Sequence, residues 1–165
     1  MALFSFVVTF TVVRMLTKQA EGPSGKDKVL PAYAGRPANW TYYGADKEGR
    51  HYYSKVEGAT KSPGIVRVWT RLDFSEEGKN LYLAKRNNIA MSLEGYQQLT
   101  RRNVLYELNC FSERREVSTQ EVFDLTAEGK TLDYAKGGSY KDWQDVPPDS
   151  GLDELCNIVC PPKTP

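Results

Sequence analysis

Polar and apolar side chains alternate along much of the chain after residue 38, which is typical of strands with one buried face. The clearest run is GIVRVWTRLDF, and we predict a strand over residues 64 to 74. Further strands are predicted in NVLYELN before Cys110 and on both sides of the turn AEGK, residues 127 to 130. Two aromatic runs flank DKEG, where Gly49 can adopt a positive φ, and this pattern predicts a hairpin. Because no crossover helices separate these runs, we expect an antiparallel sheet of about five or six strands.

The end of the chain has a helical period instead. Ser150 can cap a helix that Pro161 would end. One face of this helix would carry apolar side chains at helical spacing: Leu152, Leu155, Cys156, Val159 and Cys160. The predicted fold class is therefore α+β, with a C-terminal helix packed against the sheet and both helical cysteines pointing at it.

The stretch between residues 75 and 103 is ambiguous. Ser75 could cap a short helical turn, because acidic residues follow it. Gly78 and the pair Asn87 and Asn88 are poor helix formers, so we do not expect a long helix here.

The N-terminal region divides into two segments ahead of a domain at residues 39–165. Residues 1–20 contain an apolar or hydroxyl run from Ala2 to Val13, closed by Arg14. The run would reach about 18 Å as a helix, too short to span a membrane but suited to a signal peptide. An uncleaved interfacial helix and a buried helix are the alternatives. Residues 21–38 are rich in proline, glycine and small residues, which predicts a flexible linker.

The charge of the chain narrows the range of partners. Lysine and arginine number 22 against 21 aspartates and glutamates, a formal net charge of +1. No overall field would attract nucleic acid, so we expect no nucleic-acid partner. We also predict no integral membrane span.

The three cysteines bear on the cellular compartment in which the protein resides, because disulfides persist outside the reducing cytosol. A bond from Cys110 to either Cys156 or Cys160 would close a loop of about 50 residues and stabilise the domain by about 4 kcal/mol. The alternatives are three reduced cysteines in a cytosolic protein, or a metal site that would need His51 or a carboxylate and fits no zinc spacing. A disulfide is consistent with export, which the signal-like N-terminal segment also predicts. The spacing does not determine whether Cys110 bonds Cys156 or Cys160.

Several pieces of the chain, in their order, resemble the surface-adhesin protein E family of small bacterial exported proteins. They are NWTYYGADKEGRHYY, GIVRVWTRLDFSEEGK, YELNC, YKDWQDVPPDSGLDEL and the final IVC. The resemblance implies a small antiparallel sheet with a packed helix, residence in the periplasm or at the cell surface or in secreted form, and binding of host extracellular proteins. It also implies a disulfide between Cys110 and Cys160.

Two tyrosine pairs are the most suggestive binding residues. In adjacent hairpin strands, one member of each pair should face the core and the other should face outward. The outward rings could contact a partner, while cross-strand pairing that only stabilises the hairpin is the alternative. The four residues are Tyr42, Tyr43, Tyr52 and Tyr53.

Two other groups of residues are predicted to have ordinary structural roles. His51, the only histidine, reads as a solvated histidine at a strand edge. A basic group reads as a solvated charged face, with binding to acidic glycans or anionic lipid as the alternative. Its members are Lys85, Arg86, Arg101 and Arg102.

The function predicted from these features is a non-enzymatic, exported, adhesin-like module that contacts a protein or cell-envelope component. No phosphate loop, nucleophile elbow or metal triad appears, so we expect no catalytic residues and no cofactor. The alternative is a periplasmic small-ligand carrier or sensor, with the ligand between sheet and helix near Trp69, Trp143 and Tyr106.

Overall fold

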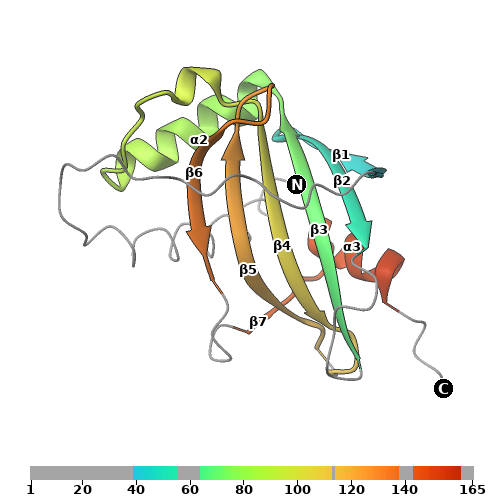
Figure 1. Cartoon of the computed structure of the whole chain (residues 1–165). Helices are drawn as coiled ribbons and strands as arrows, with labels where there is room; N and C mark the ends of the chain where they lie inside the picture. The colour runs from blue at the N-terminus through green and yellow to red at the C-terminus, as the bar shows by residue number, and fades with distance from the viewer. Residues whose placement is uncertain (1–38, 56–63, 113, 138–142, 161–165) are drawn as a thin grey trace.

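An antiparallel sheet forms the centre of the protein, for which a computed structural model describes residues 39–55, 64–112, 114–137 and 143–160 (Figure 1). Six strands follow one another across the sheet in chain order. A short seventh strand pairs with β5, on the same side of β5 as β6. The strands are β1 Thr41–Ala45, β2 Gly49–Lys55, β3 Ile65–Phe74, β4 Arg101–Asn109, β5 Glu116–Leu125, β6 Thr131–Lys136 and β7 Gln144–Asp145. The prediction of an antiparallel sheet is confirmed. The predicted signal-like segment, 1–20, and linker, 21–38, lie outside the described residues.

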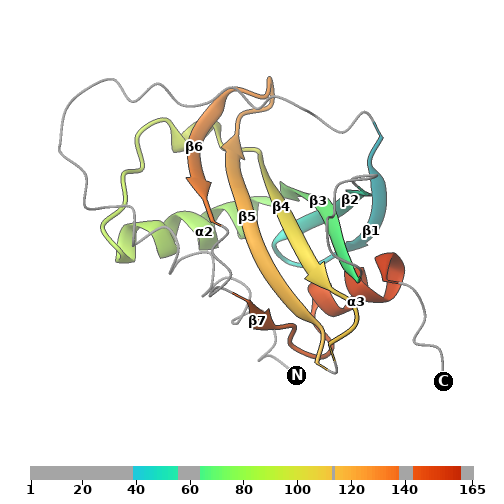
Figure 2. The same ribbon diagram turned by 60° about the horizontal axis from the view of Figure 1, so that its bottom comes forward.

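The sheet has two different faces. Val68 lies opposite Tyr106 in the β3–β4 register, and Trp69 lies opposite Leu105. Because side chains alternate along a strand, these two pairs point to opposite sides of the sheet. We call the side of Val68 and Tyr106 the helix face, and the side of Trp69, Leu105 and Phe123 the far face. The described helices α2 and α3 both pack on the helix face (Figures 1 and 2).

Helix α3, Gly151–Val159, confirms the predicted C-terminal helix. The Ser150 hydroxyl caps it by accepting a hydrogen bond from the Asp153 backbone N–H at 3.2 Å. Its buried side chains join the core of the helix face: Leu152, Leu155, Cys156 and Val159. This core also includes Val68, Tyr106 and Leu108 from the strands. The apolar face of α3 therefore packs directly against the apolar side chains of the sheet.

Helix α2, Glu76–Asn88, contradicts the expectation that no long helix follows Ser75. Ser75 does cap it, accepting a hydrogen bond from the Gly78 N–H at 2.9 Å, but the helix runs for 13 residues. Tyr82 is buried against the sheet and holds the helix there. A short 3-10 helix, Tyr96–Gln98, follows before β4. Tertiary contacts therefore outweigh the weak helix propensities of Gly78 and the two asparagines.

Gly78 is needed for a close approach between α2 and the β1–β2 turn. A Cβ at this position would overlap the backbone atoms of Glu48. We therefore expect Gly78→Ala to destabilise the protein by about 1–3 kcal/mol, because overpacking outweighs the better helix propensity of alanine. Chemical denaturation of the two proteins measures this difference.

Gly151 provides the matched control, since it also lies in the first turn of a helix. A Cβ there would meet nothing within 4 Å. Gly151→Ala should be neutral or stabilising by up to about 1 kcal/mol. Equal stabilities of the two variants would contradict the proposed role of Gly78.

Candidate binding surface

The β1–β2 turn is held by the side chain of Asp46. Its Oδ1 accepts hydrogen bonds from the backbone N–H groups of Glu48, at 2.7 Å, and Gly49, at 3.2 Å. Its Oδ2 lies 3.2 Å from His51 Nε2. Burial alone would raise the pKa of the Asp46 carboxyl, but the hydrogen bond and charge of His51 and the two backbone donors lower it below its ordinary value.

His51 is not the solvated strand-edge residue predicted from the sequence. It lies on β2, the second strand of the sheet, and its side chain is 21 % exposed. The Tyr43 ring lies beside it, with ring centroids 5.8 Å apart. The prediction was wrong because β1 covers the side of β2 that would otherwise be an edge.

The four tyrosines divide between the two faces, as alternation predicted. Tyr43 and Tyr53 pack against the core of the helix face, with ring centroids 6.0 Å apart. Burial raises the pKa of the Tyr43 hydroxyl, so this ring stays neutral. A register shift between Tyr42 and Gly44 leaves Tyr43 without a directly paired residue on β2. The partners Tyr42 and Tyr52 form an edge-to-face pair at 5.6 Å, and Tyr42 is 56 % exposed.

Arg71 joins this outward pair from β3. Its guanidinium carbon lies 4.3 Å from the centre of the Tyr52 ring and 5.4 Å from that of Trp40. Its Nη2 donates a hydrogen bond to Asp73 Oδ2 at 2.7 Å, which fixes the guanidinium over the rings. We call Trp40, Tyr42, Tyr52 and Arg71 the aromatic–arginine patch.

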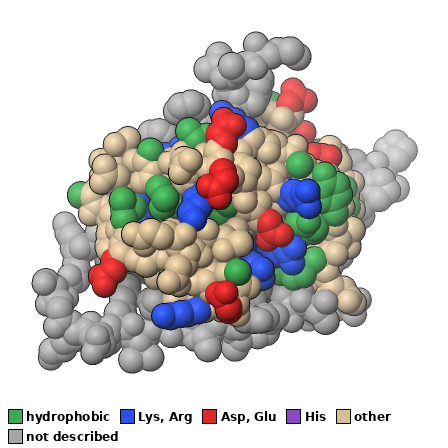
Figure 3. Space-filling view, turned by 90° about the horizontal axis from the view of Figure 1, so that it is seen from above, with side chains coloured by type: hydrophobic (Ala, Val, Ile, Leu, Met, Phe, Trp, Pro, Cys, Tyr) green, Lys and Arg blue, Asp and Glu red, His purple; other side chains and the backbone are tan. Residues whose placement is uncertain are grey.

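The patch lies at the β1–β2 side of the sheet. Figure 3 shows hydrophobic and basic side chains gathered at this end of the molecule. Sequence reasoning missed Trp40 and Arg71. The signal for Trp40 was its spacing of two residues from Tyr42, which predicts a shared face, whereas Arg71 required the strand register.

The predicted solvated basic face does not exist as a unit, because two of its members are buried. Arg102 donates to Asp124 from Nε at 2.8 Å and from Nη2 at 3.1 Å. Arg86 donates to the Tyr82 hydroxyl at 3.1 Å and to Asp133 Oδ2 at 3.1 Å. The contact between Arg86 and Asp133, which is on β6, ties α2 to the sheet. Only Lys85 and Arg101 keep about a third of their side chains exposed.

The structure does not support the ligand site that the small-ligand carrier alternative placed between the sheet and the helix. Trp69 belongs to the far face, while Tyr106 is buried on the helix face. The two rings therefore cannot line one ligand site between sheet and helix. Within the described ranges, no group of three histidine, cysteine, aspartate or glutamate side chains could hold a metal ion.

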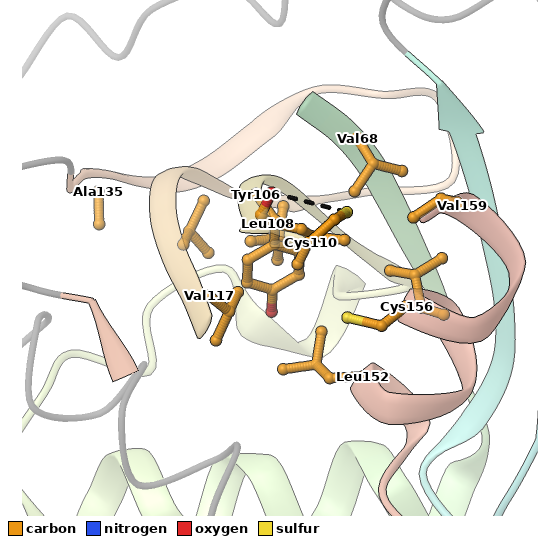
Figure 4. Packing of buried hydrophobic residues seen from close by; sticks show 12 residues of the cluster. Val68, Tyr106, Leu108, Cys110, Val117, Ala135, Leu152, Cys156 and Val159 are labelled. Carbon is orange, nitrogen blue, oxygen red and sulfur yellow. Dashed lines mark hydrogen bonds between the residues drawn. The ribbon is translucent and has the colours of Figure 1, made fainter. Parts of the chain in front are cut away.

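A disulfide joins the end of the fold to the sheet. Cys110, just after β4, bonds Cys160 at the end of α3, with an S–S distance of 2.04 Å and Cα atoms 5.5 Å apart. Figure 4 shows Cys110 and Cys156 among the apolar side chains of this core. Cys156 is a buried free thiol, and burial raises its pKa to about 11. The pairing implied by the family resemblance is confirmed.

These features define a disulfide-tied α+β domain with an outward aromatic surface at one side of its sheet. The family model for surface-adhesin protein E matches residues 40–161, and the chain belongs to this family. Neither a search of curated proteins nor a search of solved structures gave a match. Membership implies a cell-surface or exported protein with a non-enzymatic, adhesin role. None of the helices in the described part of the chain is long and apolar enough to span a membrane.

Proposed function

We propose that this protein is an exported binding module whose aromatic–arginine patch contacts a protein or cell-envelope component. Residence in the periplasm or at the cell surface, directed by the signal-like residues 1–20, is part of the proposal. The observation that carries it is the exposure of Tyr42 beside an ordered pair of Tyr52 and Arg71. Tyrosine, tryptophan and arginine supply much of the binding energy at protein interfaces.

The order of the patch supports binding in a second way. Tyr52 is held between Tyr42 and Arg71, and Arg71 is held by Asp73. Side chains that are ordered before binding lose little conformational entropy when a partner arrives. The inward tyrosines, Tyr43 and Tyr53, contribute by anchoring the hairpin to the core rather than by touching the partner.

A binding comparison tests this function. The full chain is applied to purified extracellular-matrix proteins and to isolated cell-envelope fractions, and binding is measured by surface plasmon resonance. Because two central aromatic contacts are lost, Tyr42→Ser with Tyr52→Ser should weaken binding by about 30-fold, or about 2 kcal/mol.

Phe111→Ser is the matched control, because it removes an aromatic ring that is 68 % exposed outside the patch. This variant should bind as the unmodified protein does. Equal binding by the double tyrosine variant, or failure of the unmodified protein to bind any probe, would contradict the proposed function. Thermal unfolding of each variant shows that it is folded.

A further inference from the structure

Three arginines and one carboxylate lie beside the aromatic–arginine patch. Asp73 on β3 is paired with Arg50 on β2 and with Arg101 on β4 in the strand register. Arg71 lies two residues before Asp73 on β3, so all four side chains project from the far face of the sheet. We call Arg50, Arg71 and Arg101 the arginine triad. Its three positive charges exceed the one negative charge of Asp73.

The three guanidiniums differ in how firmly they are held. Arg71 Nη2 donates a hydrogen bond to Asp73 Oδ2 at 2.7 Å. Arg101 Nε forms an ion pair with Asp73 Oδ1 at 4.0 Å, and its Nη2 donates to the Ala127 carbonyl at 3.4 Å. The Arg50 side chain is exposed and has neither an ion pair nor a hydrogen bond to any described residue. Arg50 is therefore the member of the triad that is most available to a partner.

Nearby carboxylates do not cancel the charge of the triad. Glu128, exposed on the turn after β5, interacts electrostatically with Arg101. Asp46 is engaged with His51 and with two backbone N–H groups of the β1–β2 turn. Even with Glu128 counted beside Asp73, positive charge is in excess around Arg50.

Exposed aromatic surface adjoins the triad. Tyr52 follows Arg50 by two residues on β2 and lies directly opposite Arg71 on β3. Tyr42 packs edge-to-face on Tyr52 and is 56 % exposed. Figure 3 shows basic and hydrophobic side chains together at this end of the molecule. Positive charge and aromatic rings are therefore presented by neighbouring strands on one face.

We propose that this surface binds an acidic segment of a partner protein. Aspartate or glutamate carboxylates of the segment contact Arg50 and Arg101, and an apolar side chain beside them packs on Tyr42. The planar fork of arginine matches a carboxylate through two parallel hydrogen bonds. Tyrosine, tryptophan and arginine are also enriched at protein interfaces. A protein segment carries carboxylates and apolar side chains next to each other, so one partner satisfies both halves of the surface.

Recognition of an acidic segment rests on the binding function proposed above and adds the chemistry of the partner. Because the whole chain has a formal net charge of only +1, the attraction comes from the local excess at the triad. Such an attraction falls off within a Debye length, which is about 10 Å at about 0.1 M salt and about 3 Å at about 1 M. Binding should therefore be sensitive to salt, and loss of charge from the triad should slow association.

Surface plasmon resonance with defined polymers tests the partner class. The full chain is passed over a random copolymer of glutamate and tyrosine, with a copolymer of lysine and tyrosine as the charge-reversed control. Heparin, and vesicles of phosphatidylcholine with phosphatidylglycerol, present sulfates and phosphates instead. We expect the glutamate–tyrosine copolymer to be bound more tightly than the other three probes. This binding should weaken by about tenfold or more when the salt rises from about 0.1 M to about 1 M.

Substitutions at Arg50 change the charge without removing an ion pair or a side-chain hydrogen bond among the described residues. Arg50→Gln should weaken binding to the glutamate–tyrosine copolymer about fivefold, and Arg50→Glu about 30-fold, because the second change replaces attraction by repulsion. Arg114→Glu is the matched control, since its side chain is 84 % exposed and it changes the net charge equally. Arg114 follows β4 at the end opposite Arg101, so this variant should bind as the unmodified protein does.

Several results would overturn recognition of an acidic segment. They are failure to bind the glutamate–tyrosine copolymer, equal binding of the lysine–tyrosine copolymer, tighter binding of heparin or of the vesicles, binding that high salt leaves unchanged, and unweakened binding by Arg50→Glu. The matrix and envelope probes separate this outcome from the proposed function. If Tyr42→Ser with Tyr52→Ser weakens binding to those probes while Arg50→Glu does not, the binding function stands and the acidic partner is wrong. If neither change weakens it, both are wrong.

Discussion

Replacing Asp124 with asparagine is expected to lower the free energy of unfolding at neutral pH by about 3–5 kcal/mol. The Asp124 carboxylate is buried and accepts hydrogen bonds from Arg102 and from the hydroxyls of Tyr82, at 2.8 Å, and Tyr96, at 2.9 Å. Asparagine keeps the volume but removes the charge, and its amide would set a donor against the Arg102 guanidinium. The buried guanidiniums of Arg102 and Arg86 would then lose their shared carboxylate.

The effect of Asp124→Asn should depend on pH with a defined sign. Burial alone would raise the pKa of the Asp124 carboxyl, but the charge and hydrogen bonds of Arg102 and the two tyrosine hydroxyls lower it below its ordinary value. A depressed pKa in the folded state stabilises the protein above the unfolded pKa of about 3.9, and this stabilisation fades as the pH falls through the folded value. The stability difference between the two proteins should therefore narrow on acidification below about pH 4.

Denaturant unfolding at a series of pH values measures both effects. Asp145→Asn is the control, because Asp145 and its partner Arg114 have largely exposed side chains, 62 % and 84 %. This change should cost less than about 1 kcal/mol. A similar small loss for Asp124→Asn would show that the buried network contributes little to stability.

Loss of the disulfide is the second large effect. Replacing Cys110 and Cys160 with alanine should lower the free energy of unfolding by about 4 kcal/mol, because the bond closes a loop between residues 50 positions apart. Since α3 contributes buried side chains to the core, its release would also expose apolar surface. Unfolding curves with and without a reducing agent give the same comparison in the unmodified protein.

Cys156→Ala is the control for the disulfide experiment. Cys156 is buried and unbonded, so its replacement should leave the sensitivity to reducing agent unchanged. The raised pKa of this thiol, about 11, keeps it protonated and unreactive towards the disulfide near neutral pH. Equal stability of the oxidised and reduced proteins would contradict a stabilising role for the Cys110–Cys160 bond.

Part of the binding surface could be predicted from local pattern. Alternation predicted that one member of each tyrosine pair faces outward, and the structure shows that the outward members are Tyr42 and Tyr52. The contribution of Arg71 could not be predicted in this way, because its neighbours Tyr52 and Trp40 are set by strand register and by the path of the chain before β1.

The sequence by itself determined the features that depend on neighbouring residues. A period of two specified the strands, and a helical period with the Ser150 cap specified α3. Cys156 on α3 and Cys160 directly after it both lie against the core of the helix face, as predicted. Only the tertiary structure decided that α2 is long and that Arg86 and Arg102 are buried. The physical reason is that both outcomes depend on partners far along the chain, the Glu48 turn for Gly78 and the Asp124 carboxylate for the arginines. Local propensity contains no information about such partners, and their contacts outweigh it.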